Sequence, residues 1–462
     1  MYQTRILPVL EPDSLGQFQT SFPSASSSLN HWKAAAPSAP GMDALTTAAD
    51  HIRNTDTPVG FPTETVYGLG ADATRSGAVR GIFTVKGRPS DNPLIVHVCD
   101  LEMLRGLIAG SEESGKETIP AIYLPLIERF WPGPLTILLP VPSASLPPST
   151  APKWTLAPEV TAGLATFGAR LPASPLTRTL IRLADAPLAG PSANASTRPS
   201  PTTAQHVVDD LAGRIEVVLD GGACGVGVES TVVDGLCDPP VVLRPGGISL
   251  AELRAVPGWE RVERAYHDVS KGGNSTSADS SSDTKKQAQA EAELKPRAPG
   301  MKYKHYSPKA RVVLFEDWRA SAAPRSLERL VKDLQDEAGQ TPASTTVGVI
   351  RTATWPALQG SSLLQANANG NSAAPGLEVK AGGSTVVYKL EEYNYTTAQG
   401  PHVLELDLGR DVPSIAHGLF SALRDLDTRG ADVILVEGID DRGDDMASAV
   451  MNRLRKAASD VR

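Results

Sequence analysis

Residues 60–70 read Gly-Phe-Pro-Thr-Glu-Thr-Val-Tyr-Gly-Leu-Gly, and residues 86–94 read Lys-Gly-Arg-Pro-Ser-Asp-Asn-Pro-Leu. Hydroxyl side chains, glycines and paired basic residues are poor material for an apolar core. Glycines and short hydroxyl residues let backbone N–H groups approach a phosphate closely. Lys86 would add a point charge, and Arg88 would add a planar fork of donors. The two stretches therefore predict a binding site for a small anion, most simply a nucleotide.

The apolar residues around these stretches predict that helices and strands alternate in residues 42–262. Two segments place their apolar residues on one helical face, and the second ends at Lys86, before a glycine that stops it. The residues on these faces are Leu45, Ala48, Ala49 and Ile52, and Val79, Ile82, Phe83 and Lys86. Short apolar runs predict strands at 94–98, 136–139, 188–189, 217–219, 230–233 and 241–243. Residues 249–252 form a capping box that begins a further helix.

Residues 166–170, Thr-Phe-Gly-Ala-Arg, are the most informative of the predicted strands. Successive side chains of a strand point to opposite faces of the sheet, so Thr166, Gly168 and Arg170 share one face. A hydroxyl, a residue without a side chain and a guanidinium would therefore line the same space. Alone, Arg170 could equally be a charge at the surface edge of the sheet, two residues before Pro172.

The C-terminal part of the chain repeats the alternation of strands and helices. Strands are predicted at 312–315, 346–351, 403–406 and 433–437, and helices at 415–426 and 447–457. Buried strands that alternate with helices indicate a small doubly wound α/β domain.

Changes in composition divide the chain into four parts. Residues 1–41 are rich in Ser, Pro and Ala, and we expect a disordered extension. Residues 42–262 form the first globular domain and 311–462 the second. Between them, 263–310 contain a Ser-rich low-complexity run that predicts a linker. Within this linker, residues 302–308, Lys-Tyr-Lys-His-Tyr-Ser-Pro, are abruptly aromatic and basic.

The composition of the 462-residue chain narrows its partners and its compartment. Its formal net charge of −8 argues against a broad basic face for nucleic acid. Its three cysteines form no Cys-x-x-Cys pair, which favours a reducing compartment over a zinc site or a disulfide framework. No run of about 18 apolar residues occurs, so no stable membrane contact is expected. Glu11 and Asp13 count against a mitochondrial transit peptide, so we expect a cytoplasmic location and leave a mitochondrial fraction open.

Four polar clusters fall at the ends of predicted strands. They are Thr65 with Tyr67; Lys86, Arg88, Asn92 and His97; Ser192, Asn194 and Ser200; and Ser230, Thr231 and Arg244. Loops between a strand and a helix present backbone N–H groups to anions, and charge-assisted hydrogen bonds contribute about 1.5–3 kcal/mol each. Each cluster alone has a structural explanation, because a strand histidine is often satisfied within a core and Ser and Asn often form turns. Their joint occurrence favours a triphosphate site.

Seven motifs resemble, in order, those of the YrdC/YwlC threonylcarbamoyl-adenylate synthases. They lie at residues 62–70, 86–89, 92–94, 132–136, 191–194, 229–233 and 243–246. The segment 302–308 and the C-terminal domain resemble the long, two-domain branch of that family. Thr197 stands where a glycine commonly follows the Ser-Ala-Asn-x-Ser run, and inserts at 143–160 and 356–384 look specific to a lineage.

The resemblance implies an α/β fold with an N-terminal YrdC-like twisted mixed sheet with helices, a flexible linker and a smaller C-terminal Rossmann-like domain. It implies a nucleotidyltransferase that converts L-threonine, bicarbonate and ATP into threonylcarbamoyl-AMP and pyrophosphate. The product would pass to a separate tRNA threonylcarbamoyl transferase for the threonylcarbamoyladenosine modification, with weak or no direct tRNA binding by this chain. Magnesium (Mg²⁺) would arrive with ATP, and the protein would contribute no metal ligand.

The resemblance also implies roles for the predicted site residues. L-Threonine would be held by Thr65, His97, Arg170, Gly190 and Ser230. ATP would be held by Arg88, Asn92, Thr166, Ser192, Asn194, Ser200, Arg244, His305 and Tyr306. Lys86 and Arg88 would be catalytic, with Lys86 facing the phosphates or the bicarbonate, and residues 302–308 would form a lid.

Three other interpretations compete with this one. A non-catalytic RNA-binding module conflicts with the acidic charge balance and would reveal itself by weak, steeply salt-dependent tRNA binding. A carbamoyltransferase of the hydrogenase-maturation type would need zinc-finger cysteine pairs, which three scattered cysteines cannot supply. The C-terminal domain carries no catalytic cluster, so its sequence leaves open whether it supports a lid or docks a partner.

Overall fold

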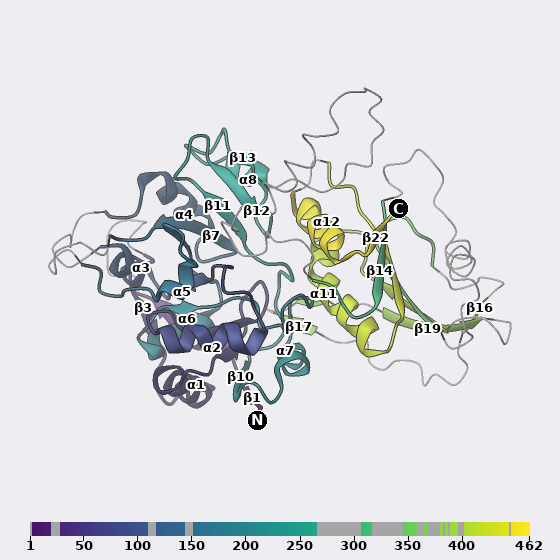
Figure 1. Cartoon of the computed structure of the whole chain (residues 1–462), viewed down its shortest axis with the longest axis horizontal. Helices are drawn as coiled ribbons and strands as arrows, with labels where there is room; N and C mark the ends of the chain where they lie inside the picture. Colours follow the sequence, from purple (N-terminus) through teal and green to yellow (C-terminus); the bar gives the residue numbers. More distant parts are fainter. Residues whose placement is uncertain are drawn as a thin grey trace.

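Figure 1 shows the computed structural model of the chain, which forms two α/β domains. The structure describes residues 2–19, 28–109, 117–143, 151–265, 306–316, 345–357, 402–442 and 445–462, and the backbone of four short strands between 364 and 395. Most of the predicted linker, including His305, lies outside the described residues, as does most of the predicted insert at 356–384.

A mixed sheet forms the centre of the first domain. Among the described residues it has eleven strands, in the order β1-β10-β4-β5-β9-β6-β8-β7-β11-β12-β13. Because β8 pairs in parallel with β6 and antiparallel with β7, the predicted mixed sheet is confirmed. The strands are β1 (Arg5–Pro8), β4 (Val59–Phe61), β5 (Gly68–Asp72), β6 (Ile95–His97), β7 (Leu135–Pro140), β8 (Thr166–Arg170), β9 (Leu188–Ala189), β10 (Val217–Asp220), β11 (Thr231–Asp234), β12 (Val241–Arg244) and β13 (Glu263–Arg264).

The helices of this domain pack along the faces that apolar spacing predicts. α1 (Met42–Asn54) buries all four residues of its predicted apolar face. α2 (Ser76–Lys86) ends at Gly87, whose φ of 62° lies in the left-handed region that favours glycine. The predicted capping box of Ser249 and Glu252 begins α8 (Leu250–Arg254). The remaining helices are η1 (Pro12–Ser14), α3 (Leu101–Ile108), η4 (Ala121–Tyr123), α4 (Leu124–Phe130), α5 (Pro158–Thr161), α6 (Pro175–Ala184) and α7 (Ala204–Leu211).

The prediction that residues 1–41 form a disordered extension is wrong for the described part of this segment. β1 pairs in parallel with β10 at the edge of the sheet, and β2 (Gly16–Phe18) forms a hairpin with β3 (Trp32–Ala34). Leu15 and Trp32 are buried in the main core. The Trp32 indole donates a hydrogen bond to Thr179 Oγ1 at 2.9 Å. Few apolar residues suffice here because they dock on a core that other segments supply.

The second domain contains a seven-stranded sheet within the described residues, in the order β16-β19-β20-β15-β21-β14-β22. Five strands run parallel, and β19 and β16 add an antiparallel edge. The predicted smaller Rossmann-like α/β domain is therefore confirmed. Its elements are β14 (Arg311–Phe315), β15 (Thr346–Arg351), β16 (Leu364–Ala366), β19 (Lys389–Tyr395), β20 (His402–Asp407), α11 (Val412–Thr428), β21 (Val433–Glu437), α12 (Asp445–Ala457) and β22 (Asp460–Val461), with a separate hairpin of β17 (Val379–Ala381) and β18 (Ser384–Val386).

Helices α11 and α12 lie between the second sheet and the first domain (Figure 1). Their apolar faces pack with Val66, Val228 and Tyr306 in one core cluster. Gly227 approaches α11 so closely that a Cβ there would lie 2.4 Å from the Cα of His417. The two domains therefore share a packed interface. Within the described ranges, no helix is long and apolar enough to cross a membrane.

Replacing Trp32 with alanine should lower the free energy of unfolding by about 3–5 kcal/mol, because it empties a buried aromatic position. Urea denaturation followed by circular dichroism measures this loss. The Leu10→Ala variant, whose side chain position is 66% exposed, should stay within about 0.5 kcal/mol of the parent chain. Equal stability of Trp32→Ala and the parent would mean that the N-terminal segment does not dock on the core.

Candidate functional site

A polar cavity lies where strand ends of the first domain meet the start of the second. Its walls come from the loop between β4 and β5, from β6 and β8, from the loop after β9, from the ends of β11 and β12, and from Tyr306. About 530 Å³ of empty space lies between these walls, and part of it is open solvent. Three arginines contribute to its lining, which suits it to a ligand with negative charge.

The five residues predicted to hold threonine all line this cavity. They are Thr65, His97, Arg170, Gly190 and Ser230. The parallel register of β6 and β8 places His97 directly beside Arg170. Ser230 lies within 2.8 Å of the Thr136 hydroxyl across the β7–β11 pair. The sheet thus brings together residues as distant in sequence as Thr65 and Ser230, which are 165 positions apart. That these residues bind threonine stays a prediction.

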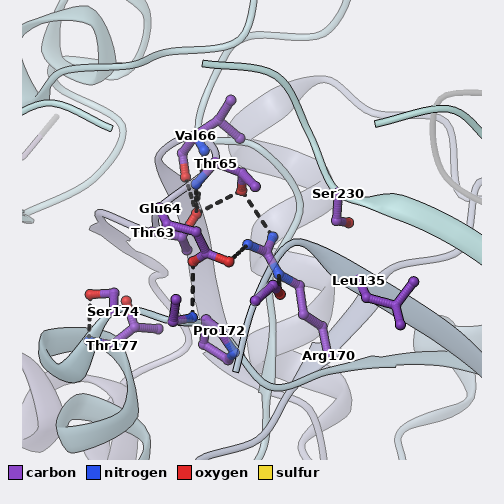
Figure 2. A network of polar contacts seen from close by, with 12 residues as sticks. Thr63, Glu64, Thr65, Val66, Leu135, Arg170, Pro172, Ser174, Thr177 and Ser230 are labelled. Carbon is purple, nitrogen blue, oxygen red and sulfur yellow. Dashed lines mark hydrogen bonds and ion pairs between the residues drawn. The ribbon is translucent and has the colours of Figure 1, made fainter. Parts of the chain in front are cut away.

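Arg170 is the centre of a buried network, shown in Figure 2. Its Nη1 donates to Thr65 Oγ1 at 2.9 Å, and its Nη2 forms an ion pair with Glu64 Oε1 at 2.6 Å. The second oxygen of Glu64 accepts from the backbone N–H of Ala173 at 3.1 Å. A buried guanidinium needs such a counter-charge, because an unpaired charge in a core is costly. Glu64 therefore fixes the position from which Arg170 faces the cavity.

His97 is held neutral inside the wall of the cavity. Burial, together with the nearby charge of Arg170, lowers the pKa of His97 to about 3. Its Nδ1 atom is buried and has no hydrogen-bond partner among the described residues. A Cβ at Gly190 would lie 2.9 Å from this nitrogen, so only glycine permits the close approach of the loop. The unpartnered nitrogen therefore lies against the backbone of the loop at Gly190.

Four of the residues predicted to bind ATP line the cavity, namely Arg88, Ser192, Arg244 and Tyr306. Burial lowers the pKa of Arg88 to about 10, which leaves it charged near neutral pH. The cavity lining does not include Asn92, Thr166, Asn194 or Ser200. Asn194 Nδ2 instead donates to two carbonyls of its own loop, and Ser200 donates to Glu229. His305 lies outside the described residues.

Lys86 lies behind the cavity wall and is not part of its lining. Its ammonium group donates to the backbone carbonyls of Ser192 and Asn194. Burial, together with the nearby charge of Arg88, lowers the pKa of Lys86 well below its usual value. The geometry differs from the prediction that Lys86 faces a ligand directly. In this structure the side chain holds the loop at residues 192–194 against the end of α2.

Glu229 is a cavity residue that the sequence prediction missed. It lies within the motif at 229–233, so the motif was the available signal, but a carboxylate is an unexpected neighbour for a phosphate. Burial alone would raise its pKa, yet the charges of Arg453 and Arg244 and the Ser200 hydrogen bond lower the pKa of Glu229 to about 2. Glu229 is therefore an anion whose charge is offset both by Arg453, which is not part of the lining, and by Arg244, which is.

Tyr306 closes the cavity from the side of the second domain. It is buried, and its ring stacks on Phe420 with ring centroids 5.2 Å apart. Its φ of 70° is rare for a residue with a bulky side chain, and such strain persists only where the surroundings enforce it. The next residue, Ser307, donates its backbone N–H to the Thr197 carbonyl at 2.7 Å. The described part of the predicted lid is thus fastened to both domains.

An α/β sheet whose strand ends gather buried arginines, hydroxyls and glycines around one cavity defines an enzyme that binds a small anionic substrate. Comparison with known proteins identifies which enzyme family this is. A family model described as "Telomere recombination" matches residues 51–246. A second model, described as "Threonylcarbamoyl-AMP synthase, C-terminal domain", matches residues 248–459.

Curated relatives and solved structures agree with these models. The threonylcarbamoyl-AMP synthase of Schizosaccharomyces pombe is 43% identical over 93% of this chain and 92% of its own length. The Pyrococcus abyssi enzyme is 39% identical over 87% of this chain and 90% of its own length. The crystal structure of P. abyssi Sua5 complexed with L-threonine superposes with a TM-score of 0.62 at 36% identity, covering 90% of this chain and 94% of that one. The chain belongs to the threonylcarbamoyl-AMP synthase family.

Membership of this family confirms the resemblance that the seven ordered motifs indicate. The chain is an enzyme of the nucleotidyltransferase type that makes threonylcarbamoyl-AMP for the modification of tRNA, with ATP as a substrate.

The low pKa of His97 predicts a loss of stability in acid. Both the folded and the unfolded chain carry neutral His97 at pH 7, but below about pH 6.5 only the unfolded chain takes up the proton. Stability is therefore lost as the pH falls from 6.5 toward 3. Between pH 7 and pH 5, His97→Gln should lose about 2 kcal/mol less unfolding free energy than the parent. Parallel pH dependence of the two proteins in urea denaturation would show that His97 is not buried neutral.

Thr197, the residue that departs from the family pattern, has a φ of 76°. This conformation costs a residue with a side chain about 1–2 kcal/mol, while glycine loses about 0.5–1 kcal/mol of unfolded-state entropy. Thr197→Gly should therefore raise the unfolding free energy by about 0.5–1 kcal/mol, measurable as a higher Tm. The Thr197→Ala variant keeps most of the strain and serves as the control. A lower Tm for Thr197→Gly than for Thr197→Ala would contradict the strain.

Proposed function

We propose that the cavity aligns L-threonine, bicarbonate and ATP for the synthesis of threonylcarbamoyl-AMP. The observation that carries this proposal is the placement of the Arg170 network beside Arg88 and Arg244 in one cavity. Arg170 is the natural fork for the carboxylate of threonine, since planar guanidinium groups bind carboxylates in this way. Thr65, His97, Gly190 and Ser230 surround that position and complete the amino-acid side of the site.

The ATP side of the proposed site lies around Arg88, Ser192, Arg244 and Tyr306. The arginines neutralise phosphate charge, and the loop at Ser192 adds a hydroxyl and backbone donors. Asn92, Asn194 and Ser200 act indirectly in this proposal, because they shape the loops and the carboxylate beside the phosphates. Lys86 acts in the same way through the carbonyls of the loop at 192–194.

The proposed reaction proceeds without a covalent enzyme intermediate. The threonine amine adds to bicarbonate and water leaves, which gives a carbamate. A carbamate oxygen then attacks the α-phosphorus of ATP, the bond from that phosphorus to the bridging oxygen breaks, and pyrophosphate carries the electron pair away. Charge that spreads over the phosphoryl oxygens is stabilised by the fixed guanidinium groups of Arg88 and Arg244. Alignment and shelter from water protect the labile carbamate, and Tyr306 contributes to that shelter.

Magnesium enters with ATP in this proposal. Phosphate oxygens and water supply most ligands that Mg²⁺ needs in such sites. Glu229, which lines the cavity, and Glu64, which bonds to Arg170, are each paired with an arginine. They are therefore poor candidates for direct metal ligands.

The product and the compartment also belong to this proposal. Threonylcarbamoyl-AMP would pass to a separate tRNA threonylcarbamoyl transferase, with weak or no binding of tRNA to this chain, because the chain carries a net charge of −8. Cys99, Cys224 and Cys237 take part in no disulfide bond, which supports a reducing compartment such as the cytoplasm.

Pyrophosphate release tests the proposed reaction, with ATP, L-threonine and bicarbonate omitted in turn. Release should require all three substrates. Within this assay, Thr65→Val should raise the KM for threonine about tenfold or more, because Arg170 loses a hydrogen-bond partner in the cavity. The KM for ATP should change less than twofold.

Thr84→Val provides the matched control, since Thr84 lies on the exposed side of α2 and bonds only within that helix. Its kinetic constants should equal those of the parent. Pyrophosphate release that does not depend on threonine would refute the proposed reaction. An equal rise of both KM values in Thr65→Val would refute the division of the cavity into two sides.

A further inference from the structure

Glu229 poses an electrostatic problem for the proposed ATP side of the cavity. Glu229 belongs to the residues that line the cavity, and it is only 6% exposed. An uncompensated buried anion beside a triphosphate would repel it strongly, since charges interact over long distances in a medium of low dielectric constant. Some cation must therefore offset Glu229 whenever the site binds a phosphate.

That cation comes from the second domain. Arg453 of α12 is 1% exposed, and its Nε and Nη2 both donate to Glu229 Oε2 at 3.1 Å. Its Nη1 donates to the Pro245 carbonyl at 2.6 Å, one residue beyond Arg244. The second oxygen of Glu229 accepts from the Ser200 hydroxyl at 2.5 Å. One guanidinium thus binds the loop before β11 and the loop after β12 of the other domain.

The next cation available to Glu229 is Arg244. Arg244 lines the cavity and donates to both the carbonyl and the hydroxyl oxygen of Ser230. The charges of Arg453 and Arg244 both lower the pKa of Glu229, so both fields reach its carboxylate. If Arg453 were absent, Glu229 would compete with the ligand for Arg244. The loss of Arg453 would also leave one fewer positive charge beside the phosphates.

The ring of Tyr306 connects the same two groups. The guanidinium carbon of Arg453 lies 5.9 Å from the centroid of this ring, within the range of a cation–π contact. Burial is the main cause that raises the pKa of the Tyr306 phenol, and the nearby charge of Glu229 raises it further. Removing the charge of Arg453 would therefore disturb Tyr306 and Glu229 together.

We propose that Arg453 is a positioning residue of the ATP site, through which the second domain neutralises Glu229 and keeps Arg244 available to the phosphates. The inference rests on the proposed assignment of Arg88 and Arg244 to ATP. In this way the second domain would influence ATP binding although Arg453 does not touch the ATP. Arg453 acts through Glu229 and touches no cavity space itself.

Arg453→Met tests this role, because methionine keeps much of the apolar stem and removes the charge. The KM for ATP should rise at least tenfold, while the KM for threonine and the kcat at saturating ATP should change less than threefold. Arg453→Lys, which keeps a positive charge near Glu229, should raise the KM for ATP less than threefold. A loss in Arg453→Lys as large as in Arg453→Met would overturn the electrostatic role.

Arg455→Met is the matched control on the same helix. Arg455 is similarly buried and pairs with Glu316 and Asp441, both in the second domain, at 2.7 Å. Its loss should destabilise the second domain without a selective rise of the KM for ATP. If Arg453→Met and Arg455→Met change all kinetic constants alike, Arg453 has only a structural role and the proposal fails.

The double variant Arg453→Met/Glu229→Gln covers the case in which Arg453→Met does not fold. It leaves no unpaired buried charge, and glutamine can still accept from Ser200. It should bind ATP within threefold of the parent in isothermal titration calorimetry. Binding that is tenfold weaker would overturn the proposal.

Calorimetry also separates this inference from the proposed function, because it needs no turnover. If the parent chain releases no threonine-dependent pyrophosphate, the proposed function fails. Tenfold weaker ATP binding by Arg453→Met than by Arg455→Met would still support the positioning role in that case. Equal ATP binding by both variants, with a fully active parent, would overturn the inference and leave the proposed function intact.

Discussion

The buried ion pair between Arg170 and Glu64 is the constraint on which the cavity depends. A guanidinium at the end of β8 has little access to water, so its charge must be met by a fixed carboxylate. Glu64 meets it and also accepts from the backbone of Ala173, while Thr65 accepts from the same guanidinium. The loop after β4, the strand β8 and the turn before α6 are thereby fixed relative to one another. The part of the cavity that we propose for threonine is built on this pair.

Much of this arrangement could be predicted from the sequence because it follows from local periodicity. The alternation in residues 166–170 predicts the face on which Arg170 lies, and the structure has β8 there. Apolar spacing predicts α1 and α2, including the end of α2 at Gly87. β6 and β8 run parallel and end at the same edge of the sheet, so His97 and Arg170, the last residues of these strands, lie side by side. The ordered motifs then identify the family.

The rest could not be predicted because it depends on which distant segments meet. Leu15 and Trp32 look isolated in a Ser- and Pro-rich segment, and only the core beneath them makes their burial favourable. Arg453 and Glu229 are 224 positions apart, so no local pattern relates them. The sequence around Lys86 is typical of a phosphate ligand. In the structure its ammonium group instead donates to two backbone carbonyls, because a buried ammonium group needs such acceptors. In each case tertiary contacts decide the role of a residue whose type is ambiguous.

The charges around the cavity fit the proposed binding of a triphosphate by an enzyme whose chain is acidic. Four arginines, Arg88, Arg170, Arg244 and Arg453, surround two carboxylates, Glu64 and Glu229. Two positive charges remain in excess, and one of the four arginines comes from the second domain. Distant surface acids are screened by salt within about 10 Å, whereas these buried charges are screened much less. The local excess of positive charge therefore determines which ligands the cavity favours. In our proposal the second domain contributes to this excess through one side chain, Arg453 of α12.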